Sequence, residues 1–458
     1  MTPNLSPLSS FNPSLVWENA LRILSEIGFA VESETVRRKI SGQLREKGGR
    51  VCFPREIVEH YAEELRRKSA AERRPPDGKP GELSLFNIGL SSYWFDPAAQ
   101  SIRPYDTATM VKHTKFVYQM ARERSFVPNV VGYPLDVPPR IQFLTLYYLH
   151  CLYNPGVGAF CLANTLDEMR FNLEIAGVLG VQPVFGTEMI SPLKFMGGSI
   201  DIAFALYRDG MAVSVDPMPI IGVTAPMDWH AAWGLSVAEN IGCYVIFRLC
   251  GVADVRPTFR LFPPNMTAGM TYFSSPKHLA AMLTRRAVRE FFGMATDGAE
   301  FLLVTSKAPD QQAAIEKTAG CLAAATHGFR YLEGAGSLWI DEVFSPQQLL
   351  IDLEIRDFVH AMRADLAPSG LNAIDEISRG VEAGSFLSTD CSLDHFEDFI
   401  WRPRLFDLGP RAAWDRRALL SRVKPQIEEK AAQYEYELGG VKREEIERIM
   451  ERARKKLS

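Results

Sequence analysis

The sequence predicts an α/β protein built on a (β/α)8 TIM barrel, with helical N-terminal and C-terminal extensions. Between residues 84 and 365, short apolar runs alternate with longer stretches of helical periodicity. Strands that are continuous apolar runs separated by helices are typical of a parallel sheet covered on both faces. Eight such units over roughly 280 residues also fit the usual barrel length of about 250 residues. We therefore expect a helical extension over 1–80, the barrel over 84–365 and a helical extension over 366–458.

The N-terminal extension is expected to be helical because its apolar positions recur at helical spacing. Leu15, Leu21, Leu24 and Ile27 form the first such stretch, and Gly28 is expected to end it. A second helical stretch begins near Pro54. It runs into "AERRPPDGKP", whose prolines and glycine predict a linker before the barrel.

Within the barrel, each expected strand is an apolar run and each expected helix follows one. The strands are "LSLFNIG", "FVPNVVGY", "GVGAFCLAN", "PVFGTEMIS", "AVSVDPMPIIG", "PTFRLF", "AEFLLVT" and "FRYLEGAG". The helices cover 106–123, 139–151, 165–180, 199–208, 228–249, 276–292, 310–325 and 345–365. Residues 243–250, "CYVIFRLC", could be a ninth strand, which would favour a doubly wound sheet; we assign them to the buried end of a helix. Charged helices are expected over 411–458.

Composition argues against several classes of protein. The chain of 458 residues has a net charge of −4 and a pI near 6.1, whereas a nucleic-acid-binding protein needs a basic face. Its seven cysteines form no C-x-x-C pair, which indicates reduced thiols and a cytoplasmic location. The N-terminus lacks a signal-peptide pattern, and the most apolar stretch, 141–164, is interrupted by His150 and "NPG". We therefore expect no nucleic-acid partner and no membrane span.

Motifs for resident metals and cofactors are also absent from the sequence. There is no H-E-x-x-H, C-x-x-C or Walker A pattern, so we expect no bound metal and no tightly bound cofactor. "DWHAAWG" at Asp228–Gly234 is one residue away from the cobalt-ligating D-x-H-x-x-G pattern. We interpret Asp228 there as a helix cap, with His230 in the first turn.

If the chain forms a barrel, residues that bind a substrate should lie where strands end and helices begin. The candidates are Tyr93, Trp94, Tyr133, Glu188, Asp216, Asp310, Gln311 and Glu333, with His327 as a further candidate. Four of them are carboxylates, against the single lysine Lys307. An acidic mouth with aromatic side chains suits a cation, which both the charges and the ring faces attract.

Several candidates also have a plain structural interpretation. Asp310 is favoured as the N-cap of the helix that follows it, and His327 as the end of that helix before Gly328. Asp216 precedes a proline and fits a turn equally well. Glu188 and Glu333 lie inside apolar runs, where an unpaired carboxylate is costly, so each needs either a partner or a function.

Motifs spread over nearly the whole chain resemble one known family. They are "ALRILSEIGFAV", "ISPLKF", "PMPIIGVTAPMDW", "PDQQAAIEK", "LLIDLEI" and "FEDFIWRPRLFD". The most specific are P-x-P-x-x-G-x-T-A-P at Pro217–Pro226 and D-Q-Q-A-x-x-E at Asp310–Glu316. Together they resemble the trimethylamine and glycine betaine methyltransferase superfamily, whose members are corrinoid-dependent.

The resemblance implies a (β/α)8 barrel with an acidic cavity, in which a methyl group moves from a methylated amine to the Co(I) of a separate corrinoid protein. The sequence contains only standard residues, so it is similar to the pyrrolysine-free branch, whose substrates are small quaternary amines such as betaines. It departs from relatives at Asp390–Cys391, where they commonly carry a His-Thr pair, and at Ala314, where they carry glycine.

Three functions stay open at this level. The leading one is a zinc-independent methyltransferase that acts on a betaine-like cation together with a corrinoid protein. A second is a catalytically degenerate barrel that only binds such a cation. A third is a barrel enzyme for a phosphorylated metabolite, with "MGGS" at Met196–Ser199 holding the phosphate at a helix N-terminus. Since large cytoplasmic barrels are often symmetric oligomers, we also expect a homo-oligomer.

Overall fold

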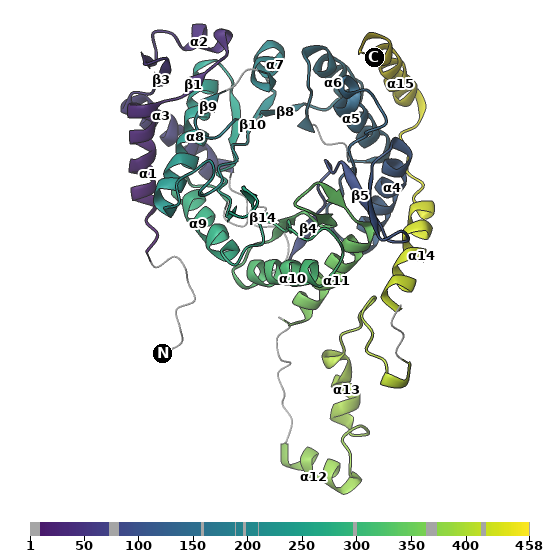
Figure 1. Cartoon of the computed structure of the whole chain (residues 1–458). Coiled ribbons are helices and arrows are strands. Elements are labelled where there is room, and N and C mark those ends of the chain that lie inside the picture. Colours follow the sequence, from purple (N-terminus) through teal and green to yellow (C-terminus); the bar gives the residue numbers. More distant parts are fainter. Residues whose placement is uncertain are drawn as a thin grey trace.

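The computed structural model describes most of the chain with full side chains. The described residues are 10–72, 82–156, 160–187, 189–195, 198–208, 210–295, 300–362, 373–413 and 418–457. They form a mixed α/β fold, as predicted, in which strands lie around a centre and helices lie outside them (Figure 1). In this part of the chain, no helix combines the length and the apolar character needed to cross a membrane.

Two parallel sheets form the inner layer. One contains β7 (Phe160–Cys161), β8 (Val184–Thr187), β10 (Ala212–Val215) and β11 (Asp254–Pro257), in the order β11-β10-β8-β7. The other contains β4 (Ser84–Phe86), β14 (Glu300–Phe301) and β15 (Tyr331–Glu333), in the order β14-β15-β4. β15 is the last of these strands along the chain and β4 the first, so their pairing joins the two ends of the series.

The strands differ from the prediction in length and, in two places, in position. The run "FVPNVVGY" contributes only a parallel bridge between Val127 and Phe86. The strand expected within "PTFRLF" lies earlier, at β11, because Asp254 and Arg256 alternate with buried residues and hide the apolar pattern. Among the described residues, no strand pairing joins β11 to β14 or Val127 to β7. In the described part of the chain, the two inner sheets are therefore separate.

All eight predicted helices of the central region are present. They are α4 (Thr107–Arg124), η2 with α5 (Pro139–Tyr153), α6 (Leu166–Leu179), α7 (Ser199–Leu206), α8 (Trp229–Leu249), α9 (His278–Phe291), α10 (Gln311–Thr326) and α11 (Pro346–Met362). Several begin at a side chain that accepts a backbone N–H three residues on, namely Asp106, Thr165, Asp228 and Asp310. Residues 243–249 belong to α8, which confirms their assignment to a helix.

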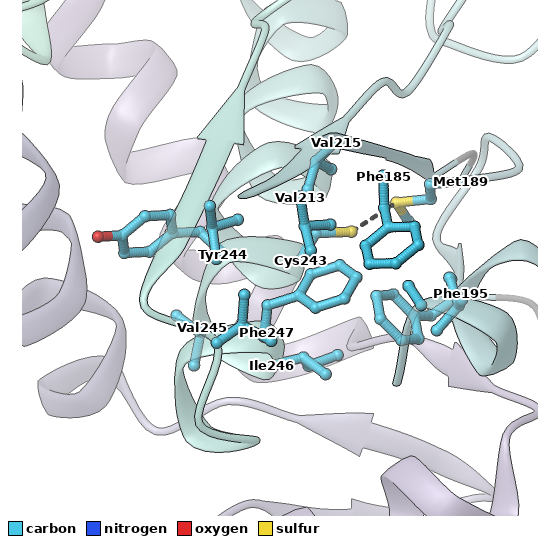
Figure 2. Packing of buried hydrophobic residues seen from close by; sticks show 14 of the residues in the cluster. Phe185, Met189, Phe195, Val213, Val215, Cys243, Tyr244, Val245, Ile246 and Phe247 are labelled. Carbon is cyan, nitrogen blue, oxygen red and sulfur yellow. Dashed lines mark hydrogen bonds between the residues drawn. The ribbon is translucent and has the colours of Figure 1, made fainter. Parts of the chain in front are cut away.

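α8 is the central helix of the core. It is buried along most of its length and packs beside Phe185 of β8 and Val213 and Val215 of β10 (Figure 2). Its Cys243 Sγ lies 3.3 Å from Met189 Sδ (Figure 2), and burial raises the pKa of this thiol well above its ordinary value. The thiol is therefore an inert core group.

The N-terminal extension is only partly helical. α1 (Pro13–Arg22) continues as a π-helical turn over Ile23–Ile27, and α2 (Glu34–Ile40) and α3 (Arg55–Glu72) follow. The predicted break at Gly28 is confirmed: its φ is +67°, and a Cβ would lie 2.2 Å from the Val51 carbonyl oxygen. The helical prediction is wrong for the strands β1 (Ala30–Val31), β2 (Arg45–Lys47) and β3 (Arg50–Cys52). β1 forms because it hydrogen-bonds to β9 (Lys194–Phe195), a partner far along the chain.

Inserted hairpins stand beyond the carboxyl ends of the inner strands. β5 (Tyr93–Asp96) and β6 (Ser101–Pro104) join β16 (Ser337–Leu338) and β17 (Val343–Phe344) in one sheet. β12 (Pro264–Asn265) pairs with β13 (Met270–Thr271). These loops surround the ends of β4, β11 and β15, where the candidate site lies.

The C-terminal part is helical, as predicted. α14 (Ala418–Gln433) packs on α4, and α15 (Gly440–Leu457) packs on α6. In the sequence, α12 (Ala373–Ala383) and α13 (Asp390–Phe399) lie between the central region and α14. In space they extend away from the rest of the molecule (Figure 1).

Candidate functional site

Glu333 lies at the carboxyl end of β15 with an aromatic residue beside it on each neighbouring strand. It is in register with Phe301 of β14 and Phe86 of β4. Register partners in a parallel sheet point to the same face. The preceding residue, Leu332, is fully buried, whereas Glu333, Phe301 and Phe86 are partly exposed. The carboxylate and both rings therefore face the inside of the strand ring rather than the helices.

The Glu333 carboxylate is partly buried but has no direct partner. Among the described residues, no side chain or backbone group forms a hydrogen bond or ion pair with it. Burial raises its pKa, Asp216 and Asp341 raise it further, and the guanidinium groups of Arg260 and Arg285 lower it. A partly shielded carboxylate in this position gains from a cationic ligand, because desolvation of its charge is then compensated.

Asp216 and Arg260 form the second charged element of the site. Asp216 follows β10, and its Oδ2 accepts a hydrogen bond of 2.8 Å from Ser214 Oγ. Its Oδ1 lies 3.3 Å from Nη1 of Arg260, which follows β11. The Arg260 guanidinium lies 5.1 Å from the centre of the Phe301 ring. Its buried Nε has no hydrogen-bond acceptor among the described residues.

A buried ion pair lies next to this group. Nη1 of Arg285, on α9, is 3.2 Å from Oε2 of Glu300, and both side chains are almost fully buried. A cavity of about 20 Å³ is lined by residues of this region, among them Arg260, Phe262, Phe273, Arg285, Glu300 and Phe301. Arg285 pairs with Glu300 and Arg260 with Asp216, whereas neither Glu333 nor the nearby Asp341 has an ion pair among the described residues.

The remaining predicted residues are distributed around this centre rather than gathered in it. Trp94 packs edge-on against His113 at 5.1 Å, and Tyr93 is exposed on β5. Tyr133 packs against Phe143 at 5.2 Å, and burial raises its pKa. Glu188 lies outside the described residues.

Asp310, Gln311 and His327 belong to α10. Asp310 Oδ1 accepts the Ala313 N–H at 2.9 Å and the Ser306 hydroxyl at 2.7 Å, which confirms the N-cap interpretation. Asp310 and Gln311 are exposed. His327 closes α10, as the favoured interpretation had it, and lies four residues before β15 begins. It is thus near the amino end of the strand that carries Glu333 at its carboxyl end.

Sequence reasoning missed Glu316, the last residue of the D-Q-Q-A-x-x-E motif. Its carboxylate accepts the Thr305 N–H, the Ser274 hydroxyl and the Gln312 amide, each at 2.8 Å. It therefore ties α10 to the strand end after β14 and to the chain after β13. Its spacing from Gln312, one helical turn, is the signal that could have placed both on one face of the helix.

A fully buried ion pair that holds the loop after Glu333 was also missed. Lys317 Nζ of α10 lies 3.1 Å from Asp352 Oδ2 of α11, and both side chains are 0% exposed. Lys317 donates to the Gly334 carbonyl at 2.7 Å, and Asp352 accepts the Gly336 N–H at 2.7 Å. The pair thus fixes the backbone on both sides of the turn that follows Glu333.

The proline-rich motif after β10 forms a compact turn. The Thr224 hydroxyl accepts the Ile220 N–H at 2.8 Å, and the Gly222 N–H donates to Ala225. Gly222 has a φ of +74°, and a Cβ there would lie 2.3 Å from Met227 Sδ. A mostly apolar cavity of about 590 Å³ separates this turn from α1. In the described part of the chain, no group of three or more His, Cys, Asp or Glu residues is placed to hold a metal ion.

Comparisons with known proteins agree with these motifs. Residues 1–434 match the family model described as "Trimethylamine methyltransferase (MTTB)". Trimethylamine methyltransferase MttB of Desulfitobacterium hafniense (strain DSM 10664 / DCB-2) is 23% identical in an alignment of 424 residues that covers 86% of this chain and 82% of that protein. The crystal structure of the Methanosarcina barkeri monomethylamine methyltransferase MtmB and that of a hydroxylamine MtmB complex each align with a TM-score of 0.46 at 12% identity, over 97% of this chain and 92% of theirs.

Proposed function

Because the chain belongs to the trimethylamine methyltransferase (MTTB) family, we propose that it is a methyltransferase for a small, betaine-like quaternary amine. The methyl group goes to the Co(I) of a separate corrinoid protein. The strand order supports a closed (β/α)8 barrel around the site. The six described cysteines that are free thiols suit a reducing cytoplasm, so the cytoplasmic location stays our prediction.

The observation that carries the proposal is the unpaired Glu333 carboxylate with Phe301 and Phe86 in register beside it. A quaternary nitrogen cannot donate a hydrogen bond, so it is recognised by charge and by ring faces. Each ring contact contributes roughly 0.5–2 kcal/mol, depending on desolvation. A betaine also carries a carboxylate. The guanidinium of Arg260, whose side chain is 24% exposed, is the group suited to bind it.

The reaction needs little covalent chemistry from this chain. The corrinoid partner supplies the nucleophilic electron pair that forms the new bond to carbon, while the C–N pair stays on nitrogen and leaves a neutral amine. Glu333 and Arg260 would hold the two ends of the substrate, so that one N–CH3 bond points to the open mouth. The substrate's positive charge disappears in the transition state, so the site must not bind the cation too tightly.

The other residues predicted to bind substrate remain proposals. Asp216 belongs to the charged group beside Glu333, and the residues proposed for the rim of the mouth are Tyr93, Trp94, Tyr133, Glu188, Asp310 and Gln311. His327 lies towards the amino end of β15, away from the mouth. A binder without activity differs from this proposal only in the transfer step. The phosphometabolite alternative rests on Met196–Ser199, of which 196 and 197 lie outside the described residues.

Calorimetry with Glu333→Gln tests the proposal. The wild type should bind a quaternary amine at least tenfold tighter than its neutral 3,3-dimethylbutyl isostere, a gap of about 1.4 kcal/mol. Glu333→Gln should reduce this gap, whereas Glu342→Gln, at an exposed carboxylate in the next loop, should not. Equal affinity of the wild type for the two ligands would refute the cation site.

Two further measurements separate the alternatives. Arg260→Gln should weaken the binding of betaines much more than the binding of choline or trimethylamine, because of these ligands only betaines carry a carboxylate. Methylation of reduced cob(I)alamin, followed by its absorbance, should occur with at least one quaternary amine. Binding without any methylation, also when a cognate corrinoid protein is supplied, would favour the degenerate binder.

A further inference from the structure

α12, α13 and the turn between them form a separate structural unit, residues 373–399, which we term the arm. It extends from the rest of the molecule (Figure 1). Its parts are fixed to one another: the Phe386 ring covers Gly380, where a Cβ would lie 2.2 Å from the ring. Arg379 bridges Glu376 at 3.2 Å and Asp390 at 3.4 Å. The arm is therefore an ordered hairpin of helices.

The arm exposes apolar side chains at helical spacing. On α12 they are Ile374, Ile377 and Val381, on α13 they are Leu393 and Phe396, and Leu387 lies between the helices; Ile400, also exposed, directly follows the arm. Val381 is 71% exposed and Leu387 86% exposed. Residues three, four and seven apart lie on one face of a helix. Monomeric soluble proteins rarely leave such a face open to water, so the face indicates a binding partner.

A second apolar surface lies where the arm joins the body. The rings of Phe358 and Trp401 are 5.0 Å apart, and those of Trp401 and Phe406 are 5.5 Å apart. Leu408, beyond them, is 69% exposed. Glu354 holds this segment by accepting the N–H groups of residues 404 and 405 at 2.7 and 2.9 Å. We term residues 401–413 and 418–424, with Phe358, the root.

The two surfaces carry opposite charges. The arm contains seven acidic residues and one arginine, a formal charge of −6. The described residues of the root between 401 and 424 include five basic residues and one acidic residue, a formal charge of +4. An arm therefore repels another arm but attracts a root. Both have an exposed apolar surface to bury on contact.

We propose that the occupant of these surfaces is a second copy of this chain. In a two-fold pair, the arm of each copy packs on the root of the other, and both contacts form at once, as twofold symmetry requires. The charge difference selects this arrangement over an arm-to-arm contact. The proposed pairing gives the expected homo-oligomer a definite interface. This proposal does not rest on the proposed function.

Sedimentation velocity or light scattering at micromolar protein tests the proposal. The wild type should have about twice the chain mass of 51.3 kDa. Val381→Glu in the arm and Leu408→Asp in the root should each give the single-chain mass. Val441→Glu on α15 is the matched control, since Val441 is 74% exposed, and it should stay paired. Raising the salt to about 1 M should weaken the pair, because the screening length falls to roughly 3 Å.

Mixing the two defective variants tests the reciprocal arrangement. Val381→Glu keeps an intact root and Leu408→Asp an intact arm, so a mixture should form mixed pairs through one intact contact. If the Leu408→Asp variant forms pairs in the absence of the other variant, the arm-on-root arrangement is wrong. A wild type of single-chain mass would overturn the proposal. Circular dichroism should show that both variants are folded, because the replaced side chains are exposed. If a variant unfolds, the mass of the wild type and its dependence on salt still test whether two copies pair.

Discussion

The buried pair of Lys317 and Asp352 gives the sharpest prediction. Lys317→Met keeps the length of the side chain. Among the described residues, it leaves Asp352 with the Gln348 amide and the Gly336 N–H as its donors. Breaking a buried ion pair on one side costs about 3–5 kcal/mol of unfolding free energy, because the remaining charge is uncompensated. We expect this loss for Lys317→Met at alkaline pH.

The loss should depend on pH in a defined direction. Burial raises the pKa of Asp352 above its ordinary value of 3.8, while Lys317 is the largest cause that lowers it. Without Lys317 the pKa rises further, so the folded variant holds a proton that the unfolded chain releases. The stability of the variant is then retained below the pKa that Asp352 has in the unfolded chain. It is lost as the pH rises through the higher pKa that Asp352 has in the folded variant. The destabilisation by Lys317→Met should therefore be smaller near pH 5 than near pH 8.

Urea unfolding at both pH values, with the double variant included, measures this. Lys317→Met with Asp352→Asn should be more stable than the sum of the single losses predicts, with a coupling of about 0.5–3 kcal/mol. The control Lys442→Met, at an exposed lysine of α15, should change stability little. Since the pair fixes the loop after Glu333, amine affinity should fall in the single variants too. Strictly additive losses, or a pH-independent loss, would refute the reasoning.

Three further predictions concern groups around the site. Glu316→Ala removes the acceptor of the Thr305 N–H and should cost about 3 kcal/mol in urea unfolding, with Glu316→Gln costing less. Burial raises the pKa of Glu239 from 4.5 to about 7. The unfolding free energy of the wild type should therefore fall by on the order of 3 kcal/mol as the pH rises from about 4.5 to about 7. Glu239→Gln should make the unfolding free energy less dependent on pH in this range. Asp310→Ala removes an N-cap and should cost about 1 kcal/mol. If Asp310 also binds the amine, calorimetry should show weaker binding.

The helices could be predicted from the sequence because their signals are local. Asp106, Thr165, Asp228 and Asp310 each cap a helix within the next turn. Strands depend on partners far along the chain, and the sequence does not show these. β1 was missed because it exists only through its pairing with β9.

The site was predicted only in part for a similar reason. Asp216 and Glu333 could be found because a barrel places strand ends together. Arg260, Lys317 and Asp352 were missed. Arg260 follows a strand whose polar residues hid it, and the other two lie on helices that normally face outward. Their roles depend on three-dimensional contacts alone.

The charge of the site differs from the prediction in a way that bears on chemistry. The sequence suggested four carboxylates against Lys307, a strongly acidic mouth. In the structure Asp216 contacts Arg260 and Glu300 contacts Arg285, while Asp310 is occupied as a helix cap. Of the four predicted carboxylates, Glu188 lies outside the described residues and Glu333 has no ion-pair partner among them. With Asp216 and Asp310 engaged in this way, the proposed site would hold a cation less firmly than four free carboxylates would. Because the positive charge is lost as the methyl group leaves, such moderate binding favours the transfer.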